Sequence, residues 1–224
     1  LQADIVCFDL EDSVPDEEKK NARKLIQTAL KSRPSYHAAI FVRINSPKSG
    51  KIPDDLNEVI HQGLDGIVIP KVNNVGEMKK IEKILLSLEK NRKLQPIQVI
   101  PSIESAEGVV NAFNIASYGK RISAVVFGVF DLFNDLGIEY TKDPEGAKYS
   151  RAKIPVDAKA AGISAIDAIW QDLNDIPGFE KDCNVGKSLG FAGKSLIHPD
   201  QISTTHKIFH PSKTEIQWAE KVYK

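Results

Sequence analysis

Two carboxylates stand at the ends of neighbouring apolar runs in the middle of the sequence. The run Ile97–Ile103 ends on Glu104, and the run Ala124–Phe130 ends on Asp131. A segment with a helical pattern, over about Ser105–Ser117, connects the two runs. We therefore expect a strand, a helix and a parallel strand, whose right-handed crossover puts both carboxyl ends at one rim. Two converging carboxylates with no sulfur or imidazole nearby suit a hard divalent cation such as Mg²⁺.

Polar side chains also stand at the ends of the first two apolar runs. Glu11 and Asp12 follow the first run, where either could cap a turn or belong to a site. Arg43 lies at the end of the second run between Val42 and Ile44. An arginine that points into an apolar core without a partner is costly, so we expect Arg43 to face a ligand.

Three further polar residues at strand ends have simpler interpretations. Lys71 follows Pro70 and is typical of a solvated loop lysine. Asp167 and His198 each follow a later run, where hydrogen bonds to neighbouring loops would explain them.

The elements that must position these residues alternate along the whole chain. Apolar runs at 4–10, 38–44, 66–69, 97–103, 124–130, 163–166 and 193–197 predict strands. Amphipathic segments at 16–32, 54–62, 75–92, 105–117, 149–160, 179–189 and 200–224 predict helices, the last with a turn at 210–212. Such alternation predicts a parallel sheet.

The number of strands favours a TIM (β/α)₈ barrel. Seven visible strands and a first strand missing before residue 1 would make eight. A doubly wound sheet is the alternative, but it usually carries a glycine-rich phosphate loop after an early strand, and none is visible. In a barrel, all the strand-end residues would face one mouth.

Composition limits the class of protein. The chain has 224 residues, 42% of them apolar, and a formal net charge of zero. The length suits one large α/β domain or two small ones, the apolar content suits a sizeable core, and the neutral balance argues against a nucleic-acid-binding surface. Because the sequence has no apolar run of membrane-spanning length and no visible signal peptide, we expect a cytoplasmic protein that binds no membrane, with the mitochondrial matrix as the alternative.

Six short motifs in a fixed order resemble one family. They are Phe8–Val14 (FDLEDSV), Val42–Asn45 (VRIN), Ile69–Val72 (IPKV), Ile103–Ala106 (IESA), Val126–Leu132 (VFGVFDL), and Gly190–Lys194 (GFAGK) with Ile197–Ile202 (IHPDQI). The chain resembles the citrate lyase β-subunit-like branch of the HpcH/HpaI aldolase/citrate lyase family over nearly its whole length. Malyl-CoA and citramalyl-CoA lyases belong to that branch.

The resemblance implies a TIM barrel, a Mg²⁺ (or Mn²⁺) site and carbon–carbon bond chemistry on a coenzyme A thioester. It implies that Glu104 and Asp131 bind the metal and, with Arg43, the substrate. The segment Gly190–Gln201 resembles the part that lies near coenzyme A. The partners implied are an acyl-CoA and an α-keto acid, and the assembly implied is a homotrimer.

Two departures concern the ends of the chain. Relatives usually begin with a strand and a Val-Pro-Gly-type loop that helps to hold the phosphates of coenzyme A. They usually also have a C-terminal segment beyond the helix at Trp218, which supplies a catalytic aspartate to a neighbouring subunit in several members. We therefore expect residues 1–224 to be a single barrel domain truncated at both ends. Within this chain, Glu11 and Asp12 are the candidates for the catalytic base.

Three functions remain open at the level of sequence. The first is a Mg²⁺-dependent lyase that reversibly cleaves a β-hydroxyacyl-CoA of the malyl-, citramalyl- or citryl-CoA type to an acyl-CoA and an α-keto acid or related carbonyl product. The second is a class II-type aldolase that acts on enolates of pyruvate or oxaloacetate without coenzyme A. The third is a non-catalytic subunit that binds a keto acid, which the presence of Glu104, Asp131 and Arg43 disfavours.

Overall fold

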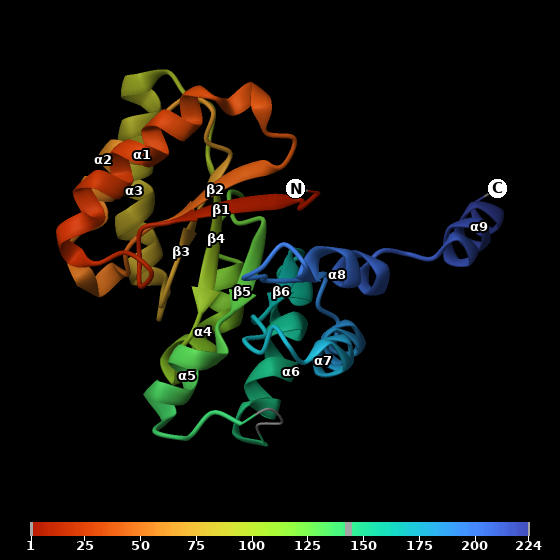
Figure 1. The fold of residues 1–224 in the computed structure, drawn as a ribbon. Coiled ribbons are helices and arrows are strands. Elements are labelled where there is room, and N and C mark those ends of the chain that lie inside the picture. The colour runs from red at the N-terminus through yellow and green to blue at the C-terminus, as the bar shows by residue number, and fades with distance from the viewer. Residues whose placement is uncertain (1, 142–144, 224) are drawn as a thin grey trace.

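A curved parallel sheet, with helices on its outer face, forms the body of the molecule (Figure 1). The computed structural model describes residues 2–141 and 145–223. The strands are β1 (Ile5–Asp9), β2 (Ala39–Arg43), β3 (Gly66–Ile69), β4 (Gln98–Ile103), β5 (Ala124–Phe127), β6 (Ser164–Asp167) and β7 (Gly193–Lys194). They follow one another in the sheet in sequence order, and each neighbouring pair is parallel. The predicted barrel class and its strand order are confirmed, and β1 and β7 form the edges.

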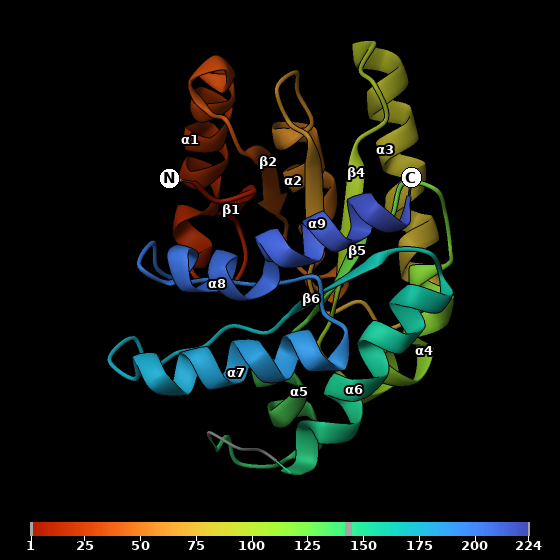
Figure 2. The same cartoon turned by 90° about the vertical axis from the view of Figure 1, so that its right-hand side faces the viewer.

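Helices connect the strands and cover the convex side of the sheet. They are α1 (Lys19–Lys31), α2 (Ile52–Val59), α3 (Val75–Arg92), α4 (Ala106–Ala116), α5 (Val129–Leu136), α6 (Glu145–Ala160), α7 (Ile176–Leu189), α8 (Gln201–Phe209) and α9 (Lys213–Val222), with 3₁₀ turns at Asp16–Glu18, Arg33–Ser35 and Pro47–Ser49. Figure 1 shows α9 standing away from the body, Figure 2 views it from the side on which it projects, and none of its residues is buried. No helix in the described parts of the chain is both long enough and apolar enough to cross a membrane.

The strands separate two apolar layers by alternation of their side chains. In β3, Ile67 and Ile69 pack with the helices in the large outer core, whereas Val68 lies in the smaller inner cluster. Phe41 of β2 and Ile100 of β4 belong to the same inner cluster. This pattern fits a barrel wall, in which successive residues point to opposite faces.

Local sequence signals explain where the helices beside the site begin. The side chain of Asn74 accepts a hydrogen bond from the Glu77 backbone at the start of α3. Ser105 does the same with the Gly108 backbone at the start of α4, at 3.0 Å. Each cap satisfies a backbone donor that the first helical turn leaves unpaired. The N-terminus of α4 is thereby fixed directly after the end of β4.

Several predicted bounds are wrong, among them those of α2, predicted at 54–62, and the start of α7, predicted at 179. The apolar run Ala124–Phe130 is not one strand: β5 ends at Phe127, and Val129 already belongs to α5. The strand predicted at 193–197 stops at Lys194, as is common for short edge strands. Helix α6 begins at Glu145 rather than near residue 149, while 143–144 of the predicted loop lie outside the described residues.

A buried ion network fastens the last two strands to the helices behind them. Arg151 of α6 binds Asp167 at the end of β6 through two nitrogens, at 3.0 and 2.5 Å, and binds Asp182 of α7 at 2.7 Å. Lys194 of β7 lies 2.9 Å from Asp167 and 2.5 Å from Asp182. Asp167 and Lys194 are fully buried, so each charge depends on its partners. This network accounts for Asp167 as a structural residue.

Replacing Lys194 tests the network. We expect Lys194→Met to lower the free energy of unfolding by about 3 kcal/mol, because two buried or half-buried carboxylates then share a single arginine. Urea unfolding followed by circular dichroism measures the change. The control is Lys148→Met, whose ion pair with Glu145 is exposed and should contribute less than about 1 kcal/mol. Equal losses in both variants would contradict a stabilising role for Lys194.

Candidate active site

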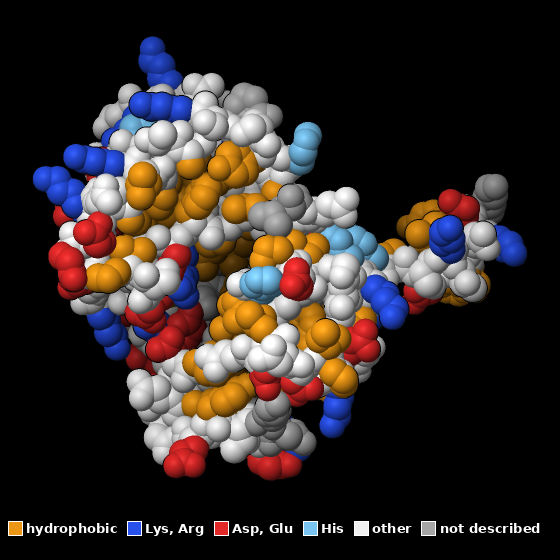
Figure 3. Space-filling view, in the orientation of Figure 1, with side chains coloured by type: hydrophobic (Ala, Val, Ile, Leu, Met, Phe, Trp, Pro, Cys, Tyr) orange, Lys and Arg blue, Asp and Glu red, His pale blue; other side chains and the backbone are white. Residues whose placement is uncertain are grey.

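The carboxyl ends of the first five strands bring the predicted polar residues together. Asp9 and Arg43 are the last residues of β1 and β2 and are direct neighbours in the sheet register. Glu104 directly follows β4, and Lys71 comes two residues after β3. Asp131 lies in the first turn of α5 rather than at the end of a strand. In Figure 3, acidic side chains gather at the rim of a hollow on this side of the molecule.

Arg43 is held by a carboxylate that sequence reasoning missed. Its Nε and Nη2 atoms donate to the two oxygens of Asp9, each at 2.6 Å. Burial opposes ionisation of Asp9, but the hydrogen bonds from Arg43, Ser13 and the Glu11 backbone outweigh it and lower the pKa of Asp9 to about 2. The two-point contact fixes the plane of the guanidinium group. The signal in the sequence was the position of Asp9 at the end of a strand next to that of Arg43.

Lys71 is not the solvated loop residue that its sequence context suggests. Its Nζ atom lies 2.8 Å from Glu11, 2.9 Å from Asp12 and 3.4 Å from Asp131. Although burial opposes the charge, these carboxylates raise the pKa of Lys71 above its usual range. Lys71 also has a φ of 53°, which is rare outside glycine and is typical of functional sites. Lys71 therefore connects Glu11, Asp12 and Asp131.

Glu11 is the buried member of the acidic pair that follows β1. Burial raises the pKa of Glu11, although Lys71 and Arg43 act in the opposite direction. Its Oε2 atom is buried without a hydrogen bond, and Nη1 of Arg43 lies 3.3 Å from it as an ion pair only. Asp12 differs, because its side chain is 63% exposed. A buried oxygen that lacks a hydrogen-bond donor is available to a ligand.

Glu104 carries the strongest electrostatic perturbation among the predicted metal ligands. The residue is 5% exposed. Burial, together with the nearby carboxylates of Glu11 and Asp131, raises the pKa of Glu104 to about 7, against a hydrogen bond from Ser102 that lowers it. Buried acids that repel one another favour protonation or a bound cation. The glutamate therefore sits where an additional positive charge would be stabilising.

A glycine makes the position of Glu104 possible. A Cβ atom at Gly128 would lie 2.4 Å from Cγ and 2.9 Å from Cδ of Glu104. Gly128 also donates a backbone hydrogen bond to Ile103, at 3.0 Å, which keeps the two strand ends together. The residue that follows β5 must therefore be glycine if the Glu104 side chain is to pass beside it.

The donor set fits a hard divalent cation. Glu104 and Asp131 offer carboxylate oxygens, with the unbonded Oε2 of Glu11 close by, and oxygen ligands are those that Mg²⁺ prefers. The charges of Glu104, Asp131, Glu11 and Asp12 exceed those of Lys71 and Arg43. A cation would balance this excess. The particular roles of these residues stay predictions.

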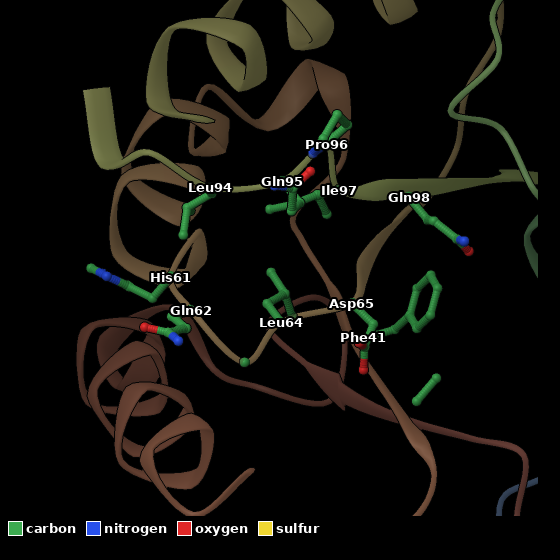
Figure 4. A pocket seen from close by; sticks show the side chains of 12 residues that line it. Phe41, His61, Gln62, Leu64, Asp65, Leu94, Gln95, Pro96, Ile97 and Gln98 are labelled. Atoms are coloured by element: carbon green, nitrogen blue, oxygen red, sulfur yellow. The ribbon is translucent and has the colours of Figure 1, made fainter. Parts of the chain in front are cut away.

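A separate cavity lies at the opposite ends of the strands. It has a volume of about 490 Å³ and is lined by residues such as Phe41, His61, Asp65 and Gln98 (Figure 4). None of the predicted site residues lines it. In barrels of this type the chemistry takes place at the carboxyl ends of the strands, so this cavity is not the candidate active site.

Fold and site together define the chain as a TIM-barrel enzyme with an acidic site at the carboxyl ends of its strands. Residues 1–199 match the family model of the HpcH/HpaI aldolase/citrate lyase. The chain belongs to the HpcH/HpaI aldolase/citrate lyase family, and it is a lyase.

Named relatives agree with this placement. The citrate lyase subunit beta of Leuconostoc mesenteroides subsp. cremoris is 35% identical over 222 residues, which cover 98% of this chain and 74% of that protein. The mitochondrial citramalyl-CoA lyase of Mus musculus is 32% identical over 233 residues, covering 99% and 69%. Protein CitE of Mycobacterium tuberculosis, solved with magnesium, acetoacetate and coenzyme A, superimposes with a TM-score of 0.77 at 27% identity, covering 99% and 78%.

Filling the space beside Gly128 tests the geometry of the acidic cluster. We expect Gly128→Ala to displace the Glu104 carboxylate and to weaken Mg²⁺ binding at least about tenfold, as loss of support for a metal ligand does. Isothermal titration measures the affinity. Gly119→Ala is the matched control, because its nearest contact is 4.0 Å away. Unchanged Mg²⁺ affinity in Gly128→Ala would show that Glu104 does not bind the metal.

Proposed function

We propose that the chain is a Mg²⁺-dependent carbon–carbon lyase. It cleaves a β-hydroxyacyl-CoA of the malyl-, citramalyl- or citryl-CoA type, reversibly, to an acyl-CoA and an α-keto acid or related carbonyl product. The observation that supports this most is the Glu104–Asp131 pair beside an arginine that is fixed in one plane. The coenzyme A and keto acid named for the M. tuberculosis protein support the substrate class.

In this proposal, Glu104 and Asp131 hold the cation. When bound, Mg²⁺ (or Mn²⁺) supplies a Lewis acid for a carbonyl oxygen and a point of attachment for the keto acid. The raised pKa of Glu104, about 7, reflects the crowding of carboxylates that a divalent ion would relieve. Lys71, 3.4 Å from Asp131, keeps the cluster partly neutralised when no substrate is present.

Arg43 is the proposed donor to the reacting group. Asp9 accepts hydrogen bonds from Nε and from one hydrogen of Nη2. The second hydrogen of Nη2 and those of Nη1 can therefore be donated to the substrate. These hydrogens can stabilise the enolate oxygen that forms as the carbon–carbon bond breaks, or grip a carboxylate. Because Asp9 fixes the guanidinium beforehand, little reorganisation is needed when charge develops.

Glu11 is the better of the two local candidates for the base. It is buried, its Oε2 has no hydrogen bond, and burial raises its pKa, which makes it a stronger base than an ordinary carboxylate. In cleavage it would take the proton of the substrate hydroxyl, and in condensation the α-proton of the acyl-CoA. Asp12 is largely exposed and paired with Lys71, so it would act through that lysine. The homotrimer and the compartment stay predictions.

Removing Asp131 tests the metal assignment and the activity together. We expect Asp131→Ala to abolish turnover in a coupled assay with malyl-, citramalyl- and citryl-CoA, because one of the two proposed carboxylate ligands of the metal is lost. Titration should also show loss of Mg²⁺-dependent keto-acid binding. Unchanged binding would contradict the metal assignment. Saturation of the unaltered protein by free pyruvate, with no effect of coenzyme A, would instead favour the aldolase without coenzyme A.

A conservative substitution tests Arg43. Lysine is a point charge and cannot keep both bonds to Asp9 while presenting a second pair of donors. We expect Arg43→Lys to lower kcat/KM by about 30-fold or more, which corresponds to about 2 kcal/mol of transition-state stabilisation. Arg33→Lys is the control, since that arginine pairs with Asp65 at the amino ends of the strands. Near-normal kcat/KM in Arg43→Lys would mean that Arg43 is structural.

A further inference from the structure

A second cluster of metal-binding side chains lies far from the acidic site. It consists of Asp4, just before β1, and His206 and His210 at the end of α8. One ligand atom from each residue can be chosen so that all three lie within 4.8 Å of one another. Histidine side chains gather on the surface where α8 leads toward α9 (Figure 3). Nothing in the proposed lyase chemistry uses these residues.

We propose that Asp4, His206 and His210 form a binding site for a borderline divalent transition metal, Zn²⁺ in the first place. Two imidazoles and one carboxylate are a ligand set that binds Zn²⁺ in proteins, with water in the remaining position. Imidazole nitrogen also makes the site poor for Mg²⁺, which prefers oxygen. The chain would thus bind two different metals at two sites. Oxygen donors at the barrel mouth would select Mg²⁺, and the two imidazoles and one carboxylate of the second site would select Zn²⁺.

The geometry is close to that of a bound metal. Ligand atoms about 2.1 Å from a tetrahedral zinc ion are about 3.4 Å apart. Nε2 of His206 already lies 3.2 Å from Oδ2 of Asp4. The rings of His206 and His210, one helical turn apart, stack with centroids 4.4 Å apart and an angle of 19°. Because Asp4 and His210 are exposed, small side-chain rotations can close the remaining distance.

The backbone around the two histidines adds a favourable field. His206 and His210 stand at the C-terminal end of α8, and the backbone of His210 donates to the His206 carbonyl at 3.0 Å. The last turn of a helix carries partial negative charge on its free carbonyls, which favours a cation. The Asp4 carboxylate adds a full negative charge.

The site would connect residues that lie far apart in the sequence. Asp4 leads into β1, and α8 follows β7. The contact between Asp4 and His206 spans 202 positions in the sequence. A metal bound only when these ends are together stabilises the folded chain over the unfolded one. We therefore assign the site a structural role, as a link between the residue before β1 and the end of α8.

Zinc titration of the untagged, chelator-treated chain tests the proposal. The titration is done in excess Mg²⁺, and we expect one Zn²⁺ per chain. Loss of even an outer partner of a metal ligand costs about 10- to 100-fold in affinity, so His206→Ala and His210→Ala should each lose at least about tenfold. His61→Ala, which removes an exposed histidine between α2 and β3, should bind normally. Asp131→Asn should also bind normally, which separates this site from the acidic cluster.

Two further readouts distinguish a built site from loose surface binding. Zn²⁺ at about 100 times its Kd should raise the Tm of the unaltered chain by about 5 °C or more, but not that of His206→Gln. Co²⁺ should give visible absorption bands that His206→Gln abolishes, and Asp4→Asn should weaken the binding without changing the fold. Wild-type zinc affinity in the histidine variants, or a Tm that zinc does not raise, would overturn the proposal.

Discussion

The crowding of carboxylates at the barrel mouth is the constraint on which the rest of the site depends. Glu104 is almost fully buried beside Glu11 and Asp131, and its pKa of about 7 records the cost of ionising it there. Such an arrangement is stable only if positive charge lies among the acids. Lys71 and Arg43 supply part of that charge, and an excess of negative charge remains at the mouth.

The backbone fixes the positions of these charged side chains in two ways: through the register of neighbouring strand ends, and through a glycine whose missing side chain leaves room for Glu104. Asp9 and Arg43 pair because their strands are neighbours in register, so the sheet itself sets the guanidinium plane. Glu104 reaches its position because Gly128 has no side chain, and Lys71 reaches three acids from a backbone conformation that is rare for lysine. Preorganisation here is therefore a property of the backbone as much as of the side chains.

Alternation of apolar runs and amphipathic segments was sufficient to predict the strand order and part of the set of residues at the mouth, although it wrongly placed Asp167 there. Val75–Arg92 was predicted with its bounds correct, because apolar spacing and an Asn cap coincide there. The position of Asp131 in a helix was not predictable. The apolar run continues without a break from β5 through Gly128 into the first residues of α5, so the sequence gives no sign of where the strand stops. Asp9 and Lys71 were missed because their importance comes from partners on other strands, which local patterns do not report.

The last two strands of the sheet differ from the first five in what their polar side chains do. Strands β1 to β5 carry the candidate chemistry, whereas β6 and β7 are fastened by the buried Arg151–Asp167–Lys194–Asp182 network and present no comparable acidic cluster among the described residues. A buried network of this kind contributes little net stability over apolar packing, but it resists rearrangement because each charge needs its partners. The network therefore holds the short edge strand β7, which has only two residues, in register. A firmly held β7 in turn gives α8, the helix that follows it, a fixed position from which His206 can contact Asp4.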